Sequence, residues 1–257
     1  MENLRSLEEA LMQYDQHLTT HPDDYKAWNN RGVALEKLGR YQDAIASYDK
    51  ALALQPDLPE TWNHRGIALA ELNRHQDALR CYDQALTLRP NLSQAWNNRG
   101  ISLRKLGRYQ AAVASHDKAI AIQPNDWQAW NNRGIALYES GRYRDALISY
   151  DKSLVIKPNN CETWTNRGNA LGKLGRYENA IDSYGEALAI QPDQALIWYN
   201  KACCYALQRQ VDLVVENLQI AINLNPERYI EMAKTDSDFD KIRQDVRFRV
   251  LLRGPVS

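Results

Sequence analysis

The sequence predicts an all-α fold in which antiparallel helix pairs of 34 residues stack one on the next. The first observation is a tryptophan that recurs every 34 residues along the 257-residue chain, at Trp28, Trp62, Trp96, Trp130, Trp164 and Trp198. The second is a proline that keeps the same interval, at Pro22, Pro56, Pro90, Pro124, Pro158, Pro192 and Pro226. A fixed interval of this length is typical of solenoid proteins whose units are pairs of secondary-structure elements.

Each unit contains two runs of helical periodicity. In the unit that starts near Trp28, apolar residues recur at three- and four-residue spacing up to Leu38 and again from Tyr41 to Leu54, which predicts two helices. The proline after each second run lacks a backbone N–H and ends that helix. An Asp or Asn after the proline can then cap the next helix.

The turn between the two helices requires a residue that tolerates the left-handed backbone conformation. Glycine fits this place in most units and asparagine in the second, at Gly39, Asn73, Gly107, Gly141 and Gly175. The small residues Gly32 and Ala44 allow the paired helices to approach closely. We expect the space around them to be filled by Trp28, Leu35 and Tyr48.

These residues carry a family resemblance. The order W-x3-G-x2-L, followed by Ala, Tyr, Ala and Pro at fixed offsets, resembles the tetratricopeptide repeat as it occurs in bacterial arrays. The resemblance covers residues 25–228 in six units, at 25–58, 59–92, 93–126, 127–160, 161–194 and 195–228. It implies a right-handed superhelical solenoid with an extended concave groove, lined by the first helix of each unit. We expect one continuous body.

The two ends depart from the full repeat. Residues 1–24 are predicted to form an N-terminal half-repeat that holds a second helix alone. Residues 229–257 are predicted to form C-terminal capping helices that seal the last repeat with Ile230, Ala233, Phe239, Ile242 and Val246.

One position on the predicted groove face is amide-rich. Two residues after each tryptophan stand Asn30, His64, Asn98, Asn132, Asn166 and Asn200. A carboxamide offers a donor and an acceptor together, so it can pair with both polar groups of an extended peptide backbone. This arrangement resembles the asparagine ladder in the superhelical domain of O-GlcNAc transferase and in the armadillo importins. The alternative is that these side chains bridge adjacent helices or face water.

Further candidate contact residues lie beside the ladder. Five residues after the tryptophan, four units carry an aliphatic stripe of Val33, Ile67, Ile101 and Ile135, and an apolar stripe turned from the core often marks a partner site. Neighbouring helices could instead half-cover it. In the fourth unit, Trp127 and Tyr138 stand where the other units carry different residues, and large aromatics near a groove suit a binding hot spot. They could equally be accidental surface aromatics.

Charged residues recur at two further positions. Arginines lie three residues after the tryptophans, at Arg31, Arg65, Arg99, Arg133 and Arg167, and aspartates recur in the second helices, at Asp49, Asp83, Asp117 and Asp151. We interpret them as structural ion pairs within or between repeats. A basic binding stripe is the alternative.

Composition excludes several function classes. Lys plus Arg and Asp plus Glu are 32 each, so there is no net field to attract nucleic acid. No apolar run is long enough for a membrane span, and the acidic first residues resemble no secretory signal. We therefore expect a cytoplasmic protein that binds neither nucleic acid nor membranes.

No catalytic or metal-binding constellation is found in the sequence. The histidines are scattered over different repeat positions, and no hydrolase or phosphate-loop motif occurs. Asp236, Asp238 and Asp240 imitate the start of a calcium loop, but Lys241 stands where glycine is needed, which favours a helix-capping turn. The sequence predicts no enzyme, no cofactor and no metal.

The predicted function is therefore a protein–protein interaction scaffold that binds an extended peptide segment in its groove. The alternatives are an adaptor that self-assembles through its ends and a helical-repeat RNA binder. We also predict a homodimer through residues 1–18, because a lone second helix leaves Leu4, Leu7, Leu11 and Leu18 without full cover. The alternative is that the charged residues of this helix keep the chain monomeric.

Overall fold

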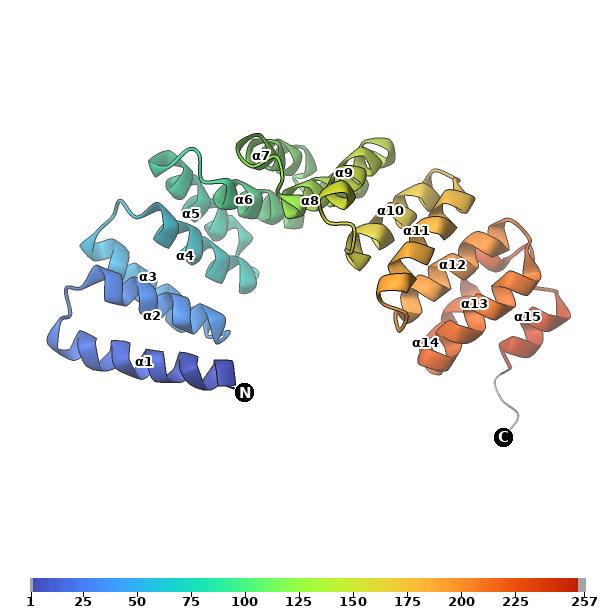
Figure 1. The fold of residues 1–257 in the computed structure, drawn as a ribbon, viewed down its shortest axis with the longest axis horizontal. Helices are drawn as coiled ribbons and strands as arrows, with labels where there is room; N and C mark the ends of the chain where they lie inside the picture. The colour runs from blue at the N-terminus through green and yellow to red at the C-terminus, as the bar shows by residue number, and fades with distance from the viewer. Residues whose placement is uncertain (1, 254–257) are drawn as a thin grey trace. The chain divides into compact units, whose positions relative to one another are not determined.

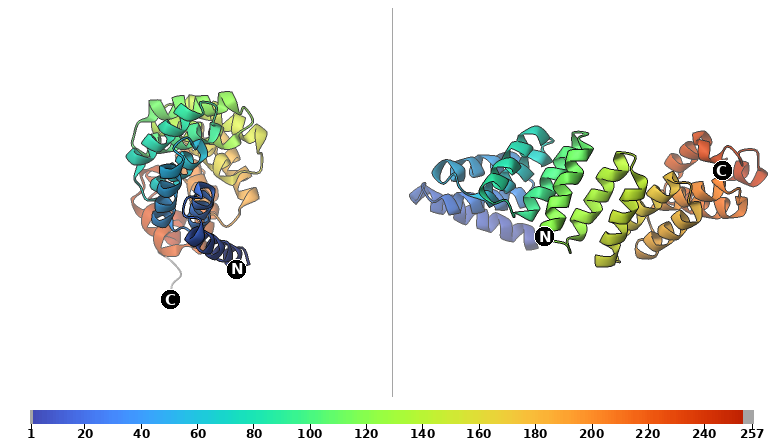
Figure 2. Two further views of the ribbon diagram at one scale, coloured as in Figure 1. Left: turned by 90° about the vertical axis from the view of Figure 1, so that its left-hand side faces the viewer. Right: turned by 90° about the horizontal axis from the view of Figure 1, so that it is seen from above.

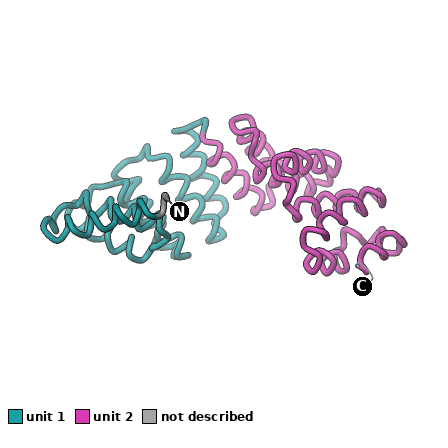
Figure 3. Tube along the Cα trace, turned by 60° about the horizontal axis from the view of Figure 1, so that its bottom comes forward, with its two compact units in different colours: residues 1–125 teal, residues 126–257 magenta. Residues whose placement is uncertain are grey.

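A computed structural model describes residues 2–253, with side chains from Arg5 onward, and all regular elements in this range are helical. The contacts divide the chain into two units, residues 1–125 and 126–257 (Figure 3). We expected one body. A solenoid repeat contacts mainly its neighbours, so few contacts tie distant repeats together. No helix among the described residues has the length and apolarity needed to cross a membrane.

The first unit is a single helix followed by three helix hairpins (Figure 1). Helix α1 (Glu2–Thr20) packs on α2 of the first hairpin. The hairpins are α2 (Tyr25–Lys37) with α3 (Tyr41–Leu54), α4 (Pro59–Glu71) with α5 (His75–Leu88), and α6 (Ser93–Lys105) with α7 (Tyr109–Ile122).

The second unit contains three further hairpins and a C-terminal cap, and Figure 2 shows the stacked hairpins from two more directions. The hairpins are α8 (Trp127–Glu139) with α9 (Tyr143–Ile156), α10 (Cys161–Lys173) with α11 (Tyr177–Ile190), and α12 (Ala195–Leu207) with α13 (Val211–Leu224). The cap consists of α14 (Pro226–Thr235), the 3-10 helix η1 (Ser237–Phe239) and α15 (Val246–Leu251).

The structure confirms the turn residues within the hairpins. Positive φ angles occur at the four predicted glycines and at Asn73, where φ is 58°. The sixth hairpin uses Arg209 instead, with φ at 60°. The predicted helix caps are only partly correct. Asp24, Asp126 and Asn160 cap the helices that follow them, whereas Leu58, Leu92 and Gln194 hold the same position without a side-chain cap.

The helices of a hairpin pack through a glycine and a large buried ring. A Cβ atom added at Gly32 would lie 2.4 Å from the ring of Tyr48, so only glycine fits there. Leu35 and Tyr48 are fully buried as predicted. Trp28 differs from the expectation, because it is half-buried and its indole Nε1 donates to the carbonyl of Pro22, 2.9 Å away. It ties the inter-repeat turn to the next helix.

The recurring arginines form the predicted ion pairs between repeats. Arg65 Nε lies 2.6 Å from the carboxylate of Asp49, in the preceding second helix. Arg31, Arg99 and Arg167 make the same pair at 2.7 Å, with Asp15, Asp83 and Asp151. The prediction of structural ion pairs is therefore confirmed for these four arginines.

The C-terminal cap buries a set of side chains that differs from the predicted one. Ala233, Phe239 and Ile242 are buried as expected, and Ile230 packs at the edge of the same cluster. Val246 is 70% exposed, so its predicted sealing role is wrong. It starts α15, and the helix turns Phe248 and Leu251 inward instead.

Helix α1 has both buried and exposed apolar side chains among those that the structure describes. Leu11 and Leu18 are each 7% exposed and Leu7 is half-buried, while Met12 is 71% exposed. The side chain of Leu4 lies outside the described residues. Leu11 and Leu18 are thus covered by the core while Met12 stays exposed, and the homodimer through residues 1–18 stays a prediction.

Candidate functional site

The amide ladder connects successive first helices. Asn98 Nδ2 donates to Asn63 Oδ1 over 3.1 Å, and Asn166 Nδ2 donates to Asn131 Oδ1 over 3.4 Å. Asn200 Nδ2 donates to Asn169 Oδ1 over 3.2 Å. A carboxamide has two N–H donors and an acceptor oxygen, so one such bond does not exhaust it.

The other ladder positions vary. His64 Nδ1 lies 3.3 Å from a carboxylate oxygen of Glu36 in the preceding first helix. Asn30 is exposed and accepts a hydrogen bond from its neighbour Asn29, 3.3 Å away. Asn132 is half-buried. The alternative that these side chains bridge adjacent helices therefore holds for Asn98, Asn166 and Asn200. Asn30 has the most exposed amide of the ladder.

The aliphatic stripe is partly covered. Each of its four members is half-buried, at Val33, Ile67, Ile101 and Ile135. In the sixth unit, the same position holds Cys203, which is buried. Only part of each of these four side chains is therefore accessible to a partner.

A pocket of about 540 Å³ lies in the second unit, lined by the first helices α8, α10 and α12, the second helix α11 and the cap. We call it the tyrosine pocket, because its lining includes Tyr138, Tyr177, Tyr184 and Tyr199. Of the residues predicted from sequence, Tyr138 and Asn200 line it. The structure therefore brings a ladder amide and a candidate hot-spot aromatic to one cavity.

The tyrosine pocket has ordered polar walls. The Tyr184 hydroxyl donates to Asn169 Oδ1 over 2.8 Å, and the same oxygen accepts from Asn200. The Tyr199 hydroxyl donates to Asp236 Oδ2 over 2.8 Å. Tyr138 packs against Tyr143, with ring centroids 5.2 Å apart. These contacts hold the walls in fixed positions.

Acidic groups and thiols form one side of the tyrosine pocket. The thiol of Cys203 and the carboxylates of Asp236 and Asp238 lie within 4.8 Å of one another. Burial and the nearby Asp236 charge raise the pKa of Asp238. Burial also raises the pKa of the Cys203 thiol, and that of Cys204 to about 12, so both thiols stay neutral near pH 7.

The cap positions the acidic side by local hydrogen bonds. Asp236 follows α14, and its Oδ1 accepts from the backbone N–H of Asp238 over 3.0 Å. This confirms the predicted helix-capping turn. Sequence reasoning missed its approach to Cys203, because the two lie 33 residues apart and outside the repeat register.

Trp127 lies outside the tyrosine pocket. It is half-buried, and the Lys157 ammonium lies 4.2 Å from its ring centroid. Trp127 therefore has a cation partner of its own, and the structure does not bring it together with Tyr138 in one cavity.

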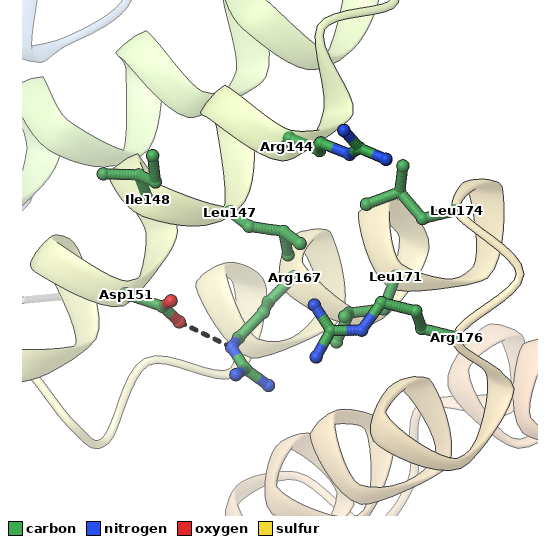
Figure 4. Close-up of a pocket in the computed structure, with 8 residues that line it drawn as sticks. All are labelled: Arg144, Leu147, Ile148, Asp151, Arg167, Leu171, Leu174 and Arg176. Carbon is green, nitrogen blue, oxygen red and sulfur yellow. Dashed lines mark hydrogen bonds and ion pairs between the residues drawn. The ribbon is translucent and has the colours of Figure 1, made fainter.

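A second depression, of about 510 Å³, lies between α9 and α10 (Figure 4). Leu147, Ile148, Leu171 and Leu174 supply its apolar lining, and Arg144 and Arg176 lie at its side. In Figure 4, Arg167 points toward Asp151, with which it forms an ion pair. Part of its polar lining is therefore structural.

Comparison with protein families gives consistent matches. Two sequence models of the tetratricopeptide repeat match this chain, one at residues 25–58 and 161–194 and the other at 64–126 and 101–160. A model of the protein prenyltransferase alpha subunit repeat matches residues 7–38. No curated protein matches the chain.

Several solved structures share the fold. YrrB, described as a TPR protein with an unusual peptide-binding site, is 21% identical with a TM-score of 0.61, covering 70% of this chain and 93% of that chain. MamA from Desulfovibrio magneticus RS-1 is 22% identical with a TM-score of 0.62, covering 66% and 96%. PilF of Pseudomonas aeruginosa is 17% identical with a TM-score of 0.69, covering 84% and 94%.

Proposed function

Because this chain belongs to the tetratricopeptide repeat family, we propose that it is a protein–protein interaction scaffold that binds an extended partner segment on its first helices. The observation that carries the proposal is the repeated amide at one position of these helices. We propose no catalytic role for this chain. Its zero net charge supports a protein partner over a nucleic acid.

The ladder geometry suits a peptide backbone. Asn98, Asn166 and Asn200 each make one hydrogen bond to the preceding repeat, which fixes the carboxamide plane without using all its polar groups. Fixed amides cost less conformational entropy when a ligand binds than freely rotating ones. Contacts to main-chain groups give affinity, while neighbouring pockets give specificity.

The tyrosine pocket supplies such a neighbouring pocket. It lies beside Asn200 and accommodates a side chain in its volume of about 540 Å³. YrrB, which shares the fold, is described as having an unusual peptide-binding site. We propose the same class of ligand for this chain, with a binding mode set by its own residues.

A peptide-array screen with the purified chain tests the proposal. We expect binding of extended peptides of several sequences, and a loss of affinity for the best peptide when Asn98→Ala, Asn132→Ala and Asn166→Ala are combined. Each lost hydrogen bond weakens binding by about 1 kcal/mol, so the combined loss is on the order of a hundredfold.

The control carries three alanines at exposed positions of the second helices, Lys50→Ala, Lys118→Ala and Lys152→Ala. Thermal unfolding of both variants separates lost binding from lost folding, because the ladder amides also bridge helices. If the triple variant folds and binds the best peptide as tightly as the intact chain, the ladder amides do not contact the peptide.

A further inference from the structure

We propose that the tyrosine pocket binds a lysine or arginine side chain of the partner segment, with Asp238 as the counter-charge. This inference rests on the proposed function and names the chemistry of the partner at one position. It is carried by the charge, the aromatic lining and the hydrogen bonding of the pocket.

The charges that line the tyrosine pocket favour a cation. Asp236 and Asp238 contribute two carboxylates, whereas Lys173 at the exposed rim contributes one ammonium group. The Cys203 and Cys204 thiols add no charge near neutral pH, because burial raises the pKa of both. The lining therefore carries an excess of negative charge, in a chain whose net charge is zero.

Hydrogen bonding favours Asp238 over Asp236 as the counter-charge, although Asp238 also accepts from the Cys203 thiol. Asp236 already accepts from the Tyr199 hydroxyl at one oxygen and from the Asp238 backbone N–H at the other. Asp238 is half-buried, and the Asp236 carboxylate beside it disfavours its ionised form. A bound ammonium or guanidinium group would relieve this repulsion, and a charge-assisted hydrogen bond of this kind is stronger than a neutral one.

The aromatic walls suit the same ligand. Four tyrosines line the pocket, and the negative faces of aromatic rings attract a cation within about 6 Å of the ring centroid. Aromatic faces also cover the methylene stem of a lysine or arginine, so the stem and the charged head both find partners. A metal ion would leave most of a volume of about 540 Å³ unused.

The test uses the full chain and a fluorescent peptide from the array that contains a single lysine. Replacing that lysine with norleucine, which keeps the stem and removes the charge, is expected to weaken binding about tenfold or more. Asp238→Asn is expected to weaken binding of the lysine peptide by a similar factor and to leave the affinity for the norleucine peptide unchanged. The control is Glu231→Gln, whose carboxylate is exposed and pairs with Lys234 at 2.6 Å.

A stability measurement separates this role from a structural one. Burial and the charges of Asp236 and Asp240 raise the pKa of Asp238, against lowering effects of Cys203 and Lys173. Ionised Asp238 therefore costs the folded chain free energy, and stability falls as the pH rises through its raised pKa. Asp238→Asn is expected to raise the unfolding temperature at neutral pH while it weakens binding, and the gain should vanish below the ordinary pKa of 3.8.

The outcomes distinguish the two proposals. Tight peptide binding with no dependence on the lysine charge or on Asp238 overturns the cation pocket and leaves the scaffold function intact. If no array peptide binds, both fall together. If binding is abolished by a chelator and restored by zinc, the Cys203 and Asp236 cluster holds a metal, and the cation pocket is overturned.

Discussion

At the scale of single residues, the packing of each hairpin depends on a matched pair, one small residue and one large one. Glycine faces a tyrosine ring in four units, and Gly100 faces His116 in the third. In the sixth unit, both members of the pair differ: Ala202 occupies the glycine position and Leu218 the position of the ring. Both are fully buried. A larger residue on one helix is thus accompanied by a smaller one on the other.

This pairing predicts a compensated substitution. A Cβ atom at Gly66 would lie 2.5 Å from the Tyr82 ring, so Gly66→Ala should destabilise the chain by about 1–3 kcal/mol. Adding Tyr82→Leu should cost less in the Gly66→Ala background than in the intact chain, with a coupling of about 1 kcal/mol in urea unfolding. Additive effects of the two changes would contradict the account.

The matched control is a glycine with open space around it. Gly185 lies within α11, and an added Cβ atom would meet nothing within 4 Å. Gly185→Ala should therefore stabilise the chain by roughly 0.5–1 kcal/mol, because alanine is the better helix former.

At the scale of the helices, one arginine joins a first helix to the preceding second helix in four places, at Arg31, Arg65, Arg99 and Arg167. Arg167 pairs with Asp151 of the preceding second helix, donates to Ser183 of its own second helix over 2.7 Å, and lies 5.6 Å from the Trp164 ring centroid. One side chain thus contacts three helices. Repeat proteins depend on such contacts between neighbours, because a single hairpin buries too little surface to be stable alone.

Removing this arginine should therefore cost more than removing another one nearby. Arg167→Gln is expected to destabilise the chain by about 1–2 kcal/mol, because it removes one hydrogen bond and one partly exposed ion pair. Arg176→Gln is the control, since Arg176 is exposed and contacts Asn179 within its own hairpin. Its effect should stay within about 0.5 kcal/mol, and equal losses in both variants would refute the junction role of Arg167.

The repeat pattern explains how much could be predicted from sequence. Trp28, Gly32 and Gly39 have equivalents in other units, so their spacing predicted the hairpins and the left-handed turn residues. The cap has no second copy in the chain, and the prediction chose Val246 where the structure buries Phe248. A short helix of six residues gives too little periodicity to assign its buried face.

The candidate site was predictable only where it follows the repeat. Asn200 was found because an amide recurs at its position, and Tyr138 because it departs from the residues that the other units carry at its position. Both line the tyrosine pocket. The acidic side was missed, because Asp236 and Asp238 belong to the cap and no spacing rule connects them to Cys203. The aliphatic stripe follows a repeat position, but its exposure depends on neighbouring helices, and its four members are half-buried.

At the scale of the whole molecule, the chain consists of two units that each contain three hairpins. The ladder has members in both, whereas the tyrosine pocket lies entirely in the second unit. We therefore propose that the second unit supplies both backbone contacts and a side-chain pocket. The first unit supplies amides and the half-covered aliphatic stripe.

Amide hydrogen exchange of the full chain, with and without the best array peptide, tests the central claim most directly. Ligand binding suppresses the local opening of the elements that it contacts. We expect slower exchange in the first helices α6, α8, α10 and α12 and around η1, and little change in α9 and α13. Protection confined to α9, α13 or α1 would contradict a partner site on the first helices.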